Sequence, residues 1–118
     1  LLNMLLVYLI LFEFFVKNPW AAGCLFIQKG GWGLTGRYEP WLSAGTAYKT
    51  TGWTTVSFPL SNIKSKANGA DGTGAPAKTI SDLIGATGNS KLEFDFTNPT
   101  IAVSNLDMAI DNIRIVKK

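Results

Sequence analysis

Short runs of β-prone residues separated by turn residues restrict the fold of this chain more than any other feature. The run at residues 91–97, KLEFDFT, alternates large apolar and acidic side chains, as a strand with one buried face does. Similar runs cover residues 9–16, 22–28, 53–60, 101–103 and 108–116. No helical pattern of ten residues lies between these runs. The sequence therefore predicts an all-β fold, an antiparallel β-sandwich.

Length and composition agree with one small β-domain. A chain of 118 residues holds one domain with a single core. Twelve glycines and five prolines, with 47% apolar and only 16% charged residues, suit short strands joined by turns. The net charge is only +3 and the lysines are scattered, so the chain lacks the basic footprint of a nucleic-acid-binding protein. We expect no nucleic acid among its partners.

The chain begins with an uncharged apolar run, LLNMLLVYLILF. This run is too short for a bilayer, which needs about 20 residues, and it lacks the basic start and the cleavage site of a signal peptide. We therefore divide the chain into an apolar segment, residues 1–11, and a single β-sandwich domain, residues 12–118. The segment is a strand, a leader remnant or an artefact. We interpret the chain as part of a longer protein, with a sandwich truncated at its N-terminus.

Several kinds of catalysis are excluded by the residue types present. The chain has no histidine, which excludes the Ser-His-Asp and Cys-His arrangements. The single cysteine, Cys24, excludes an internal disulfide and a cysteine-based zinc site, and its apolar neighbours favour a buried thiol. Glycoside hydrolysis usually needs two facing carboxylates, yet Glu39 is the only acidic residue within the aromatic-rich residues 30–60. We predict no enzymatic activity.

Residues 30–60 hold three of the four tryptophans and two of the three tyrosines. Trp32, Tyr38, Trp41 and Tyr48 lie among glycine, serine, threonine and proline residues, which indicates loops, and loops lie at the surface. A ring on a surface loop either folds back on the core or offers a flat apolar face that matches a pyranose ring. Covering about 80 Å² of sugar contributes about 2 kcal/mol. The leading hypothesis is binding of a polysaccharide or oligosaccharide; the alternative is a structural or adhesive β-sandwich domain without a glycan ligand.

Four strings carry a family resemblance: FEFFVKNPW at residues 12–20, YEPW at 38–41, GWTTVSFPLS at 52–61 and IDNIRIVKK at 110–118. Together they resemble the C-terminal glycan-binding domain of the Bacteroidetes surface glycan-binding proteins, over roughly residues 12–118. Those proteins are outer-membrane lipoproteins of polysaccharide-utilisation systems. The resemblance implies a jelly-roll sandwich, no catalysis, no cofactor, and an aromatic platform for a polysaccharide. It also implies a cell-surface location within a longer lipoprotein, beside other outer-membrane glycan-uptake proteins.

The resemblance also suggests which residues contact the glycan. Carried over by position, Trp32, Tyr38 and Trp41 match the loop region where such proteins stack sugars. Trp20 and Trp53 are further candidates, each with a structural role as the alternative. The polar groups expected to set specificity are Gln28, Arg37 and Glu39. The identity of the glycan does not follow from these residues.

Two segments contain residues that calcium sites use. The DGTG at residues 71–74 lacks the acidic alternation and terminal glutamate of an EF-hand loop. It lies within residues 61–78, a polar segment rich in glycine and alanine that we expect to form a mobile connection. Asp111 and Asn112 lie near the terminal strand, where jelly-roll modules of this kind often hold a structural calcium. The alternative there is a turn hydrogen bond accepted by Asp111.

Overall fold

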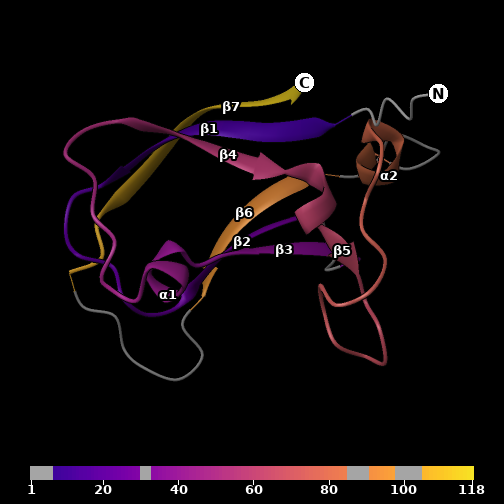
Figure 1. Cartoon of the computed structure of the whole chain (residues 1–118), viewed down its shortest axis with the longest axis horizontal. Coiled ribbons are helices and arrows are strands. Elements are labelled where there is room, and N and C mark those ends of the chain that lie inside the picture. Colours follow the sequence, from indigo (N-terminus) through magenta and orange to yellow (C-terminus); the bar gives the residue numbers. More distant parts are fainter. Residues whose placement is uncertain (1–6, 30–32, 85–90, 98–104) are drawn as a thin grey trace.

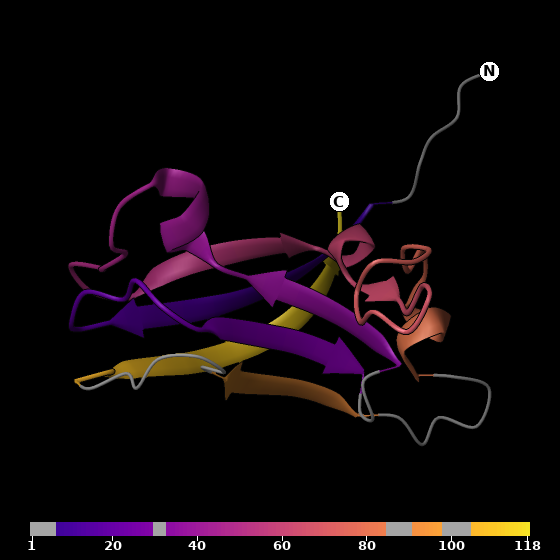
Figure 2. The same ribbon diagram turned by 90° about the horizontal axis from the view of Figure 1, so that it is seen from below.

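A computed structural model describes residues 7–29, 33–84, 91–97 and 105–118 as two antiparallel sheets stacked face to face (Figures 1 and 2). The first sheet has the order β4-β1-β7, and the second has the order β5-β3-β2-β6. The strands are β1 (Tyr8–Val16), β2 (Cys24–Lys29), β3 (Leu34–Tyr38), β4 (Thr54–Pro59), β5 (Lys64–Ser65), β6 (Leu92–Thr97) and β7 (Met108–Lys117). The short helices are α1 (Pro40–Ala44), the 3-10 turn η1 (Leu60–Asn62) and α2 (Ile80–Ile84). The predicted β-sandwich is confirmed.

Strand β1 is the middle strand of the first sheet, and its alternation separates the core from the surface. Its inward side chains are fully buried and form the centre of the core: Ile10, Phe12, Phe14 and Val16. Phe12 and Phe14 meet edge to face, with ring centroids 5.6 Å apart. Across the sandwich, Phe12 also meets Phe94 of β6 edge to face at 5.3 Å. The apolar side chains of β6 thus face the core, as the alternation in residues 91–97 predicted.

The N-terminal segment contributes directly to β1. The strand begins at Tyr8, which pairs with Lys117 of β7, and Leu9 pairs with Pro59 of β4. Residues 8–11 of the predicted apolar segment are therefore part of the central strand. Ile10 of this stretch lies in the core, whereas Leu9 and Leu11 lie on the other face of the strand and are half-buried.

Two predictions about connecting segments differ from the structure. Residues 30–52 do not form one aromatic loop, because β3 and α1 lie within them, whereas the strand predicted at 53–60 is present as β4. Residues 61–78 contain η1, β5 and isolated bridges, and the backbone of Ala77 donates to the carbonyl of Ile63 at 2.8 Å. The polar composition of that segment concealed this pairing, since backbone groups make it. Helix α2 follows this segment, and the predicted strand at 101–103 lies outside the described residues.

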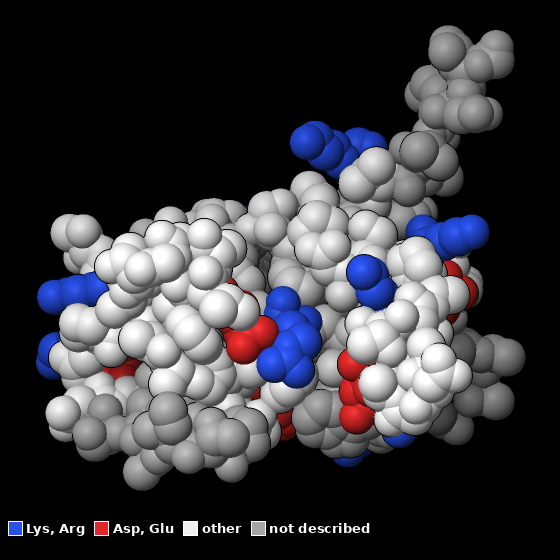
Figure 3. All heavy atoms as spheres, turned by 60° about the horizontal axis from the view of Figure 1, so that its bottom comes forward, with Lys and Arg blue, Asp and Glu red and all other residues white. Residues whose placement is uncertain are grey.

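Charged side chains are spread over the surface of the sandwich. Figure 3 shows acidic and basic groups interspersed over one face, without a large field of one sign. On the outer face of the first sheet, Glu13 accepts hydrogen bonds from Thr55 Oγ1 at 2.6 Å and from Arg114 at 2.8 Å. These two donors hold the pKa of the Glu13 carboxyl below its ordinary value. Glu13 thus links all three strands of this sheet.

Gly36 of β3 gives a test of how closely the two sheets approach. A Cβ at Gly36 would lie 2.7 Å from the ring of Phe58 and 3.2 Å from the carbonyl oxygen of Asn62. Gly36→Ala is expected to lower the free energy of unfolding by about 1–3 kcal/mol, because the Phe58 ring must move. Urea unfolding measures the change. Gly33→Ala is the control, since a Cβ there meets nothing within 4 Å; an equal loss in both variants would contradict this explanation.

The Glu13 hydrogen bonds predict a pH dependence of stability. Because the folded pKa is lowered, the contribution is fully present above the unfolded pKa of about 4.5 and is lost as the pH falls through the folded value. Glu13→Gln is expected to lower the urea midpoint at pH 7, with a difference from wild type that shrinks below pH 4.5. Asp107→Asn is the control, because no side-chain bond of Asp107 occurs among the described residues. A constant difference across pH would rule out this role.

Candidate functional site

One end of the sandwich gathers the segments that carry Trp20, Trp41, Tyr48 and Trp53. The connections after β1 and before β4 meet there, beside α1, while α2 lies at the opposite end (Figure 2). Trp20 and Tyr48 exchange backbone hydrogen bonds, N–H to O, at 2.9 and 2.8 Å. The N–H of Thr50 donates to the carbonyl of Val16 at 3.0 Å, and the N–H of Val16 donates to Thr50 Oγ1 at 2.9 Å. Two of these bonds attach the loop at residues 48–52 to the end of β1, and the other two attach it to Trp20 in the connection that follows β1.

Trp53 is the most exposed of the tryptophans in the described part of the chain. Its side chain is 54% exposed, and it lies between Gly52 and the first residue of β4. Its indole meets the half-buried ring of Phe15 at a centroid distance of 5.8 Å and an interplanar angle of 81°. The contact orients the indole without covering it. Trp53 therefore offers an aromatic face to solvent from a defined position.

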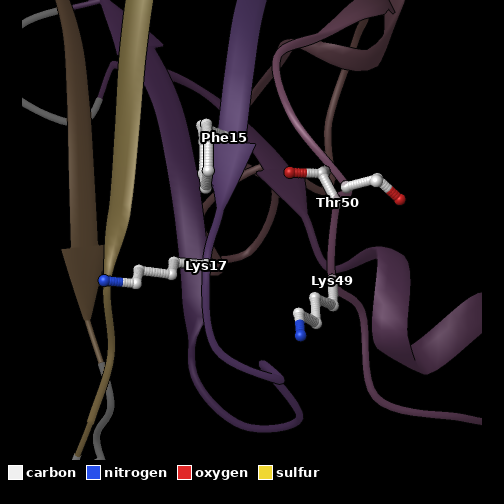
Figure 4. A pocket seen from close by; sticks show the side chains of 5 residues that line it. Phe15, Lys17, Lys49 and Thr50 are labelled. Carbon is white, nitrogen blue, oxygen red and sulfur yellow. The ribbon is translucent and has the colours of Figure 1, made fainter.

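Two open hollows adjoin this indole. One, of about 340 Å³, is lined by residues 48–54 and includes Trp53 itself. The other, of about 430 Å³, is lined by Phe15, Lys17, Lys49, Thr50 and Thr51 (Figure 4). We call Phe15, residues 48–54 and these two hollows the Trp53 surface. It combines an exposed indole with threonine hydroxyls, and none of the described residues that line either hollow carries a carboxylate.

Two of the predicted site aromatics belong to the core. Trp20 is only 1% exposed, packs edge to face on Phe14 and Phe96, and donates its Nε1–H to the carbonyl of Ala22 at 2.7 Å. The half-buried Tyr38 meets the rings of Phe12 and Phe58 among others. Burial and the neighbouring Tyr48 raise the pKa of Tyr38 far above its ordinary value. Trp20 therefore has no free face for a ligand, and Tyr38 has its ring committed to packing.

Trp41 and Trp32 are the other two tryptophans predicted for the platform. Trp41 in α1 is half-buried, packs against the core, and donates its Nε1–H to the carbonyl of Gly23 at 3.3 Å. Its neighbour Leu42 is 62% exposed. Trp32 lies outside the described residues. Among the candidates that the structure describes, Trp20, Tyr38 and Trp41 pack on the core and only Trp53 is largely exposed, so these four do not form one platform.

The predicted polar residues lie away from the Trp53 surface. Gln28 is fully buried and hydrogen-bonds through its amide to Asp95. Arg37 forms an ion pair with Glu39 at 3.0 Å and lies over the ring of Phe26. Arg37, Tyr38 and Glu39 help to line a separate groove of about 430 Å³ beside α1 and β4. Sequence reasoning thus placed in one site residues that the fold divides between two surfaces.

Cys24 and Asp111 have local structural roles. Cys24 is buried, as predicted, and burial raises the pKa of its thiol to about 11. The Oδ1 of Asp111 accepts a hydrogen bond at 2.8 Å from the backbone N–H of Asn112, which is the alternative that the sequence offered to calcium binding. Within the described ranges, no three metal-binding side chains cluster, and no helix has the length and hydropathy of a membrane span.

Sequence reasoning missed most of the Trp53 surface. Phe15 and Lys17 were not selected, because they are far from Trp53 in sequence. Lys49 was not selected either, since its partner at the hollow, Lys17, is 32 positions away. The alternation of β1 was a usable signal for Phe15, since Phe14 and Val16 are core residues and the residue between them must face outward. No comparable signal exists for the lysines.

Comparison with protein families defines the chain as a glycan-binding domain. The matching family is described as surface glycan-binding protein B xyloglucan binding domain, and its model matches residues 5–117. The chain belongs to this family, which confirms the resemblance seen in its sequence. Comparisons with curated proteins and with solved structures gave no significant match.

The different burial of Trp20 and Trp53 predicts different effects on stability. Trp20→Ala is expected to lower the free energy of unfolding by about 3–5 kcal/mol, because it leaves a cavity among aromatic rings. Trp53→Ala is expected to cost about 1 kcal/mol or less, since roughly half of its side chain is already in water. Urea unfolding of both variants tests this. A Trp53→Ala loss as large as that of Trp20→Ala would make Trp53 a core residue.

Proposed function

We propose that this domain binds a polysaccharide through the Trp53 surface and catalyses no reaction. The observation that carries the proposal is the exposed indole of Trp53, fixed on Phe15, in a chain that belongs to a family of glycan-binding domains. The absence of carboxylates from the lining of both hollows supports binding without hydrolysis, which usually uses two facing carboxylates.

The chemistry of the surface fits a sugar chain. A pyranose ring stacked on Trp53 removes about 80 Å² of apolar area from water, which contributes about 2 kcal/mol. Thr51 and Thr54 supply hydroxyl groups beside the indole that exchange hydrogen bonds with sugar hydroxyls. One stacked ring with a few hydrogen bonds leaves a modest affinity after the costs of association, in the micromolar to millimolar range.

Xyloglucan is the first candidate ligand, because the family takes its description from xyloglucan binding. The proposed location is the cell surface, where the domain is part of a longer outer-membrane lipoprotein beside other glycan-uptake proteins. Trp41 and Trp32 stay in the proposal as secondary contacts for further sugar units. The attachment of the 48–52 loop to β1 favours a binding surface that exists before the ligand arrives.

Affinity-gel electrophoresis tests the proposal with xyloglucan and a panel of other soluble polysaccharides. Wild-type protein is expected to be retarded, and Trp53→Ala is expected to weaken binding about 30-fold, which corresponds to about 2 kcal/mol. Trp53→Phe is expected to retain part of the affinity, because it keeps an aromatic face. Ile84→Ala is the matched control: Ile84 is 47% exposed on α2, at the other end of the molecule.

Three outcomes would count against the Trp53 surface. Unchanged retardation of a folded Trp53→Ala variant would remove Trp53 from the site. Loss of binding in Trp41→Ala alone would move the site to α1. A folded wild-type domain that no polysaccharide retards would favour the alternative function, a structural or adhesive sandwich domain.

A further inference from the structure

We propose that the hollow beneath Phe15 is a subsite for an anionic sugar, one that carries a uronate carboxylate or a sulfate ester. This inference rests on the proposed function and deepens it: since xyloglucan is neutral, the subsite directs the preference toward a polymer that also carries acidic or sulfated units. It comes from Lys17 and Lys49, two lysines 32 positions apart in sequence that line the same hollow of about 430 Å³.

The backbone places the two lysines at a fixed separation. Lys17 follows Val16, and Lys49 precedes Thr50. Val16 and Thr50 are joined by two hydrogen bonds, one between backbone groups at 3.0 Å and one from the Val16 N–H to Thr50 Oγ1 at 2.9 Å. The same pair of bonds that shapes the loop therefore brings both lysines to the rim of one hollow.

The side chains leave the hollow open to a ligand. Figure 4 shows Phe15 on β1, Lys17 on the continuation of the same strand, and Lys49 on the neighbouring segment that also carries Thr50. In this view Lys17 extends toward β7, and Lys49 extends below Thr50. Each ammonium stands on a flexible four-carbon stem, so it can turn toward an anion over the hollow. The threonine hydroxyls nearby add hydrogen-bonding groups.

The positive charge of these lysines is not compensated within the described part of the chain. The ion pairs found there are Arg37–Glu39, Lys66–Asp71, Lys91–Glu93 and Arg114–Glu13, and none includes Lys17 or Lys49. Asp107 is the nearby acidic residue: its backbone carbonyl accepts from the Lys17 N–H at 2.9 Å, but its carboxylate pairs with neither lysine. A sugar carboxylate or sulfate would supply the missing charge.

The hollow is also continuous with the aromatic face. Phe15 lines the hollow and at the same time supports the indole of Trp53. Lys49, Thr50 and Thr51 line both this hollow and the one that contains Trp53. A neutral sugar stacked on Trp53 thus leaves the next unit of the sugar chain near the lysines.

Exposed ion pairs are weak and are screened by salt, so the two lysines together are expected to contribute about tenfold in affinity at low salt.

Dissociation constants for matched polymers test the subsite. Wild-type protein is titrated in 50 mM and 500 mM NaCl with polygalacturonate, its methyl ester, a sulfated galactan and xyloglucan. We expect polygalacturonate or the sulfated galactan to bind about tenfold more tightly than the uncharged methyl ester in 50 mM NaCl. That selectivity ratio should fall to about one in 500 mM NaCl and in the Lys17→Gln/Lys49→Gln variant. The two anionic polymers distinguish a carboxylate from a sulfate ligand.

The control variant is Lys64→Gln/Lys78→Gln. It also removes two positive charges, one from β5 and one from the segment just before α2. An equal loss of selectivity in this control would reduce the effect to net charge and overturn the subsite. Equal affinity of wild type for charged and uncharged polymers, with xyloglucan binding that Trp53→Ala weakens about 30-fold, would overturn the subsite and leave the proposed function standing. Failure of all four polymers to bind would overturn both.

Discussion

Burial of one face of β1 is the interaction on which the core and the candidate site both depend. The strand is hydrogen-bonded on both sides, to β4 and β7, and four of its side chains have no exposure at all. Because successive side chains of a strand point to opposite faces, packing Phe14 and Val16 inward forces Phe15 outward. The outward ring then supports Trp53. A shift of β1 by one residue would therefore destroy the core and the binding surface together.

Alternation and turn residues allowed the sandwich to be predicted, since they are local properties of the sequence. Residues 91–97 are the clearest example: their apolar side chains pack on the core as the pattern indicated. The roles of the aromatic residues depend instead on pairing between distant segments. Trp20 follows a proline in a loop, yet its backbone pairs with Tyr48 and its indole enters the core. Composition alone does not reveal on which side of a loop a ring will lie.

The polar residues illustrate the same limit. Gln28 and Arg37 lie on neighbouring strands of the second sheet, one fully buried and the other largely exposed. Because they are close in sequence to Trp32 and Trp41, a shared site was expected. They lie instead in the second sheet, whereas Trp53 precedes a strand of the first sheet. Conversely, Lys17 and Lys49 come together because a threonine hydroxyl caps the end of β1, a contact that has no local signature in the sequence.

The hydrogen bonds between Thr50 and Val16 have a consequence for how this surface responds to heat and to mutation. Binding loops commonly open more easily than the scaffold that carries them. Here the loop continues the hydrogen bonding of the central strand, so its local opening requires the end of that strand to open as well. The amide of Thr50 would then exchange with solvent only when the end of β1 opens, so the binding surface and that end of the strand would open together. Substitutions that weaken the core would reduce binding only through the fraction of molecules that remain folded.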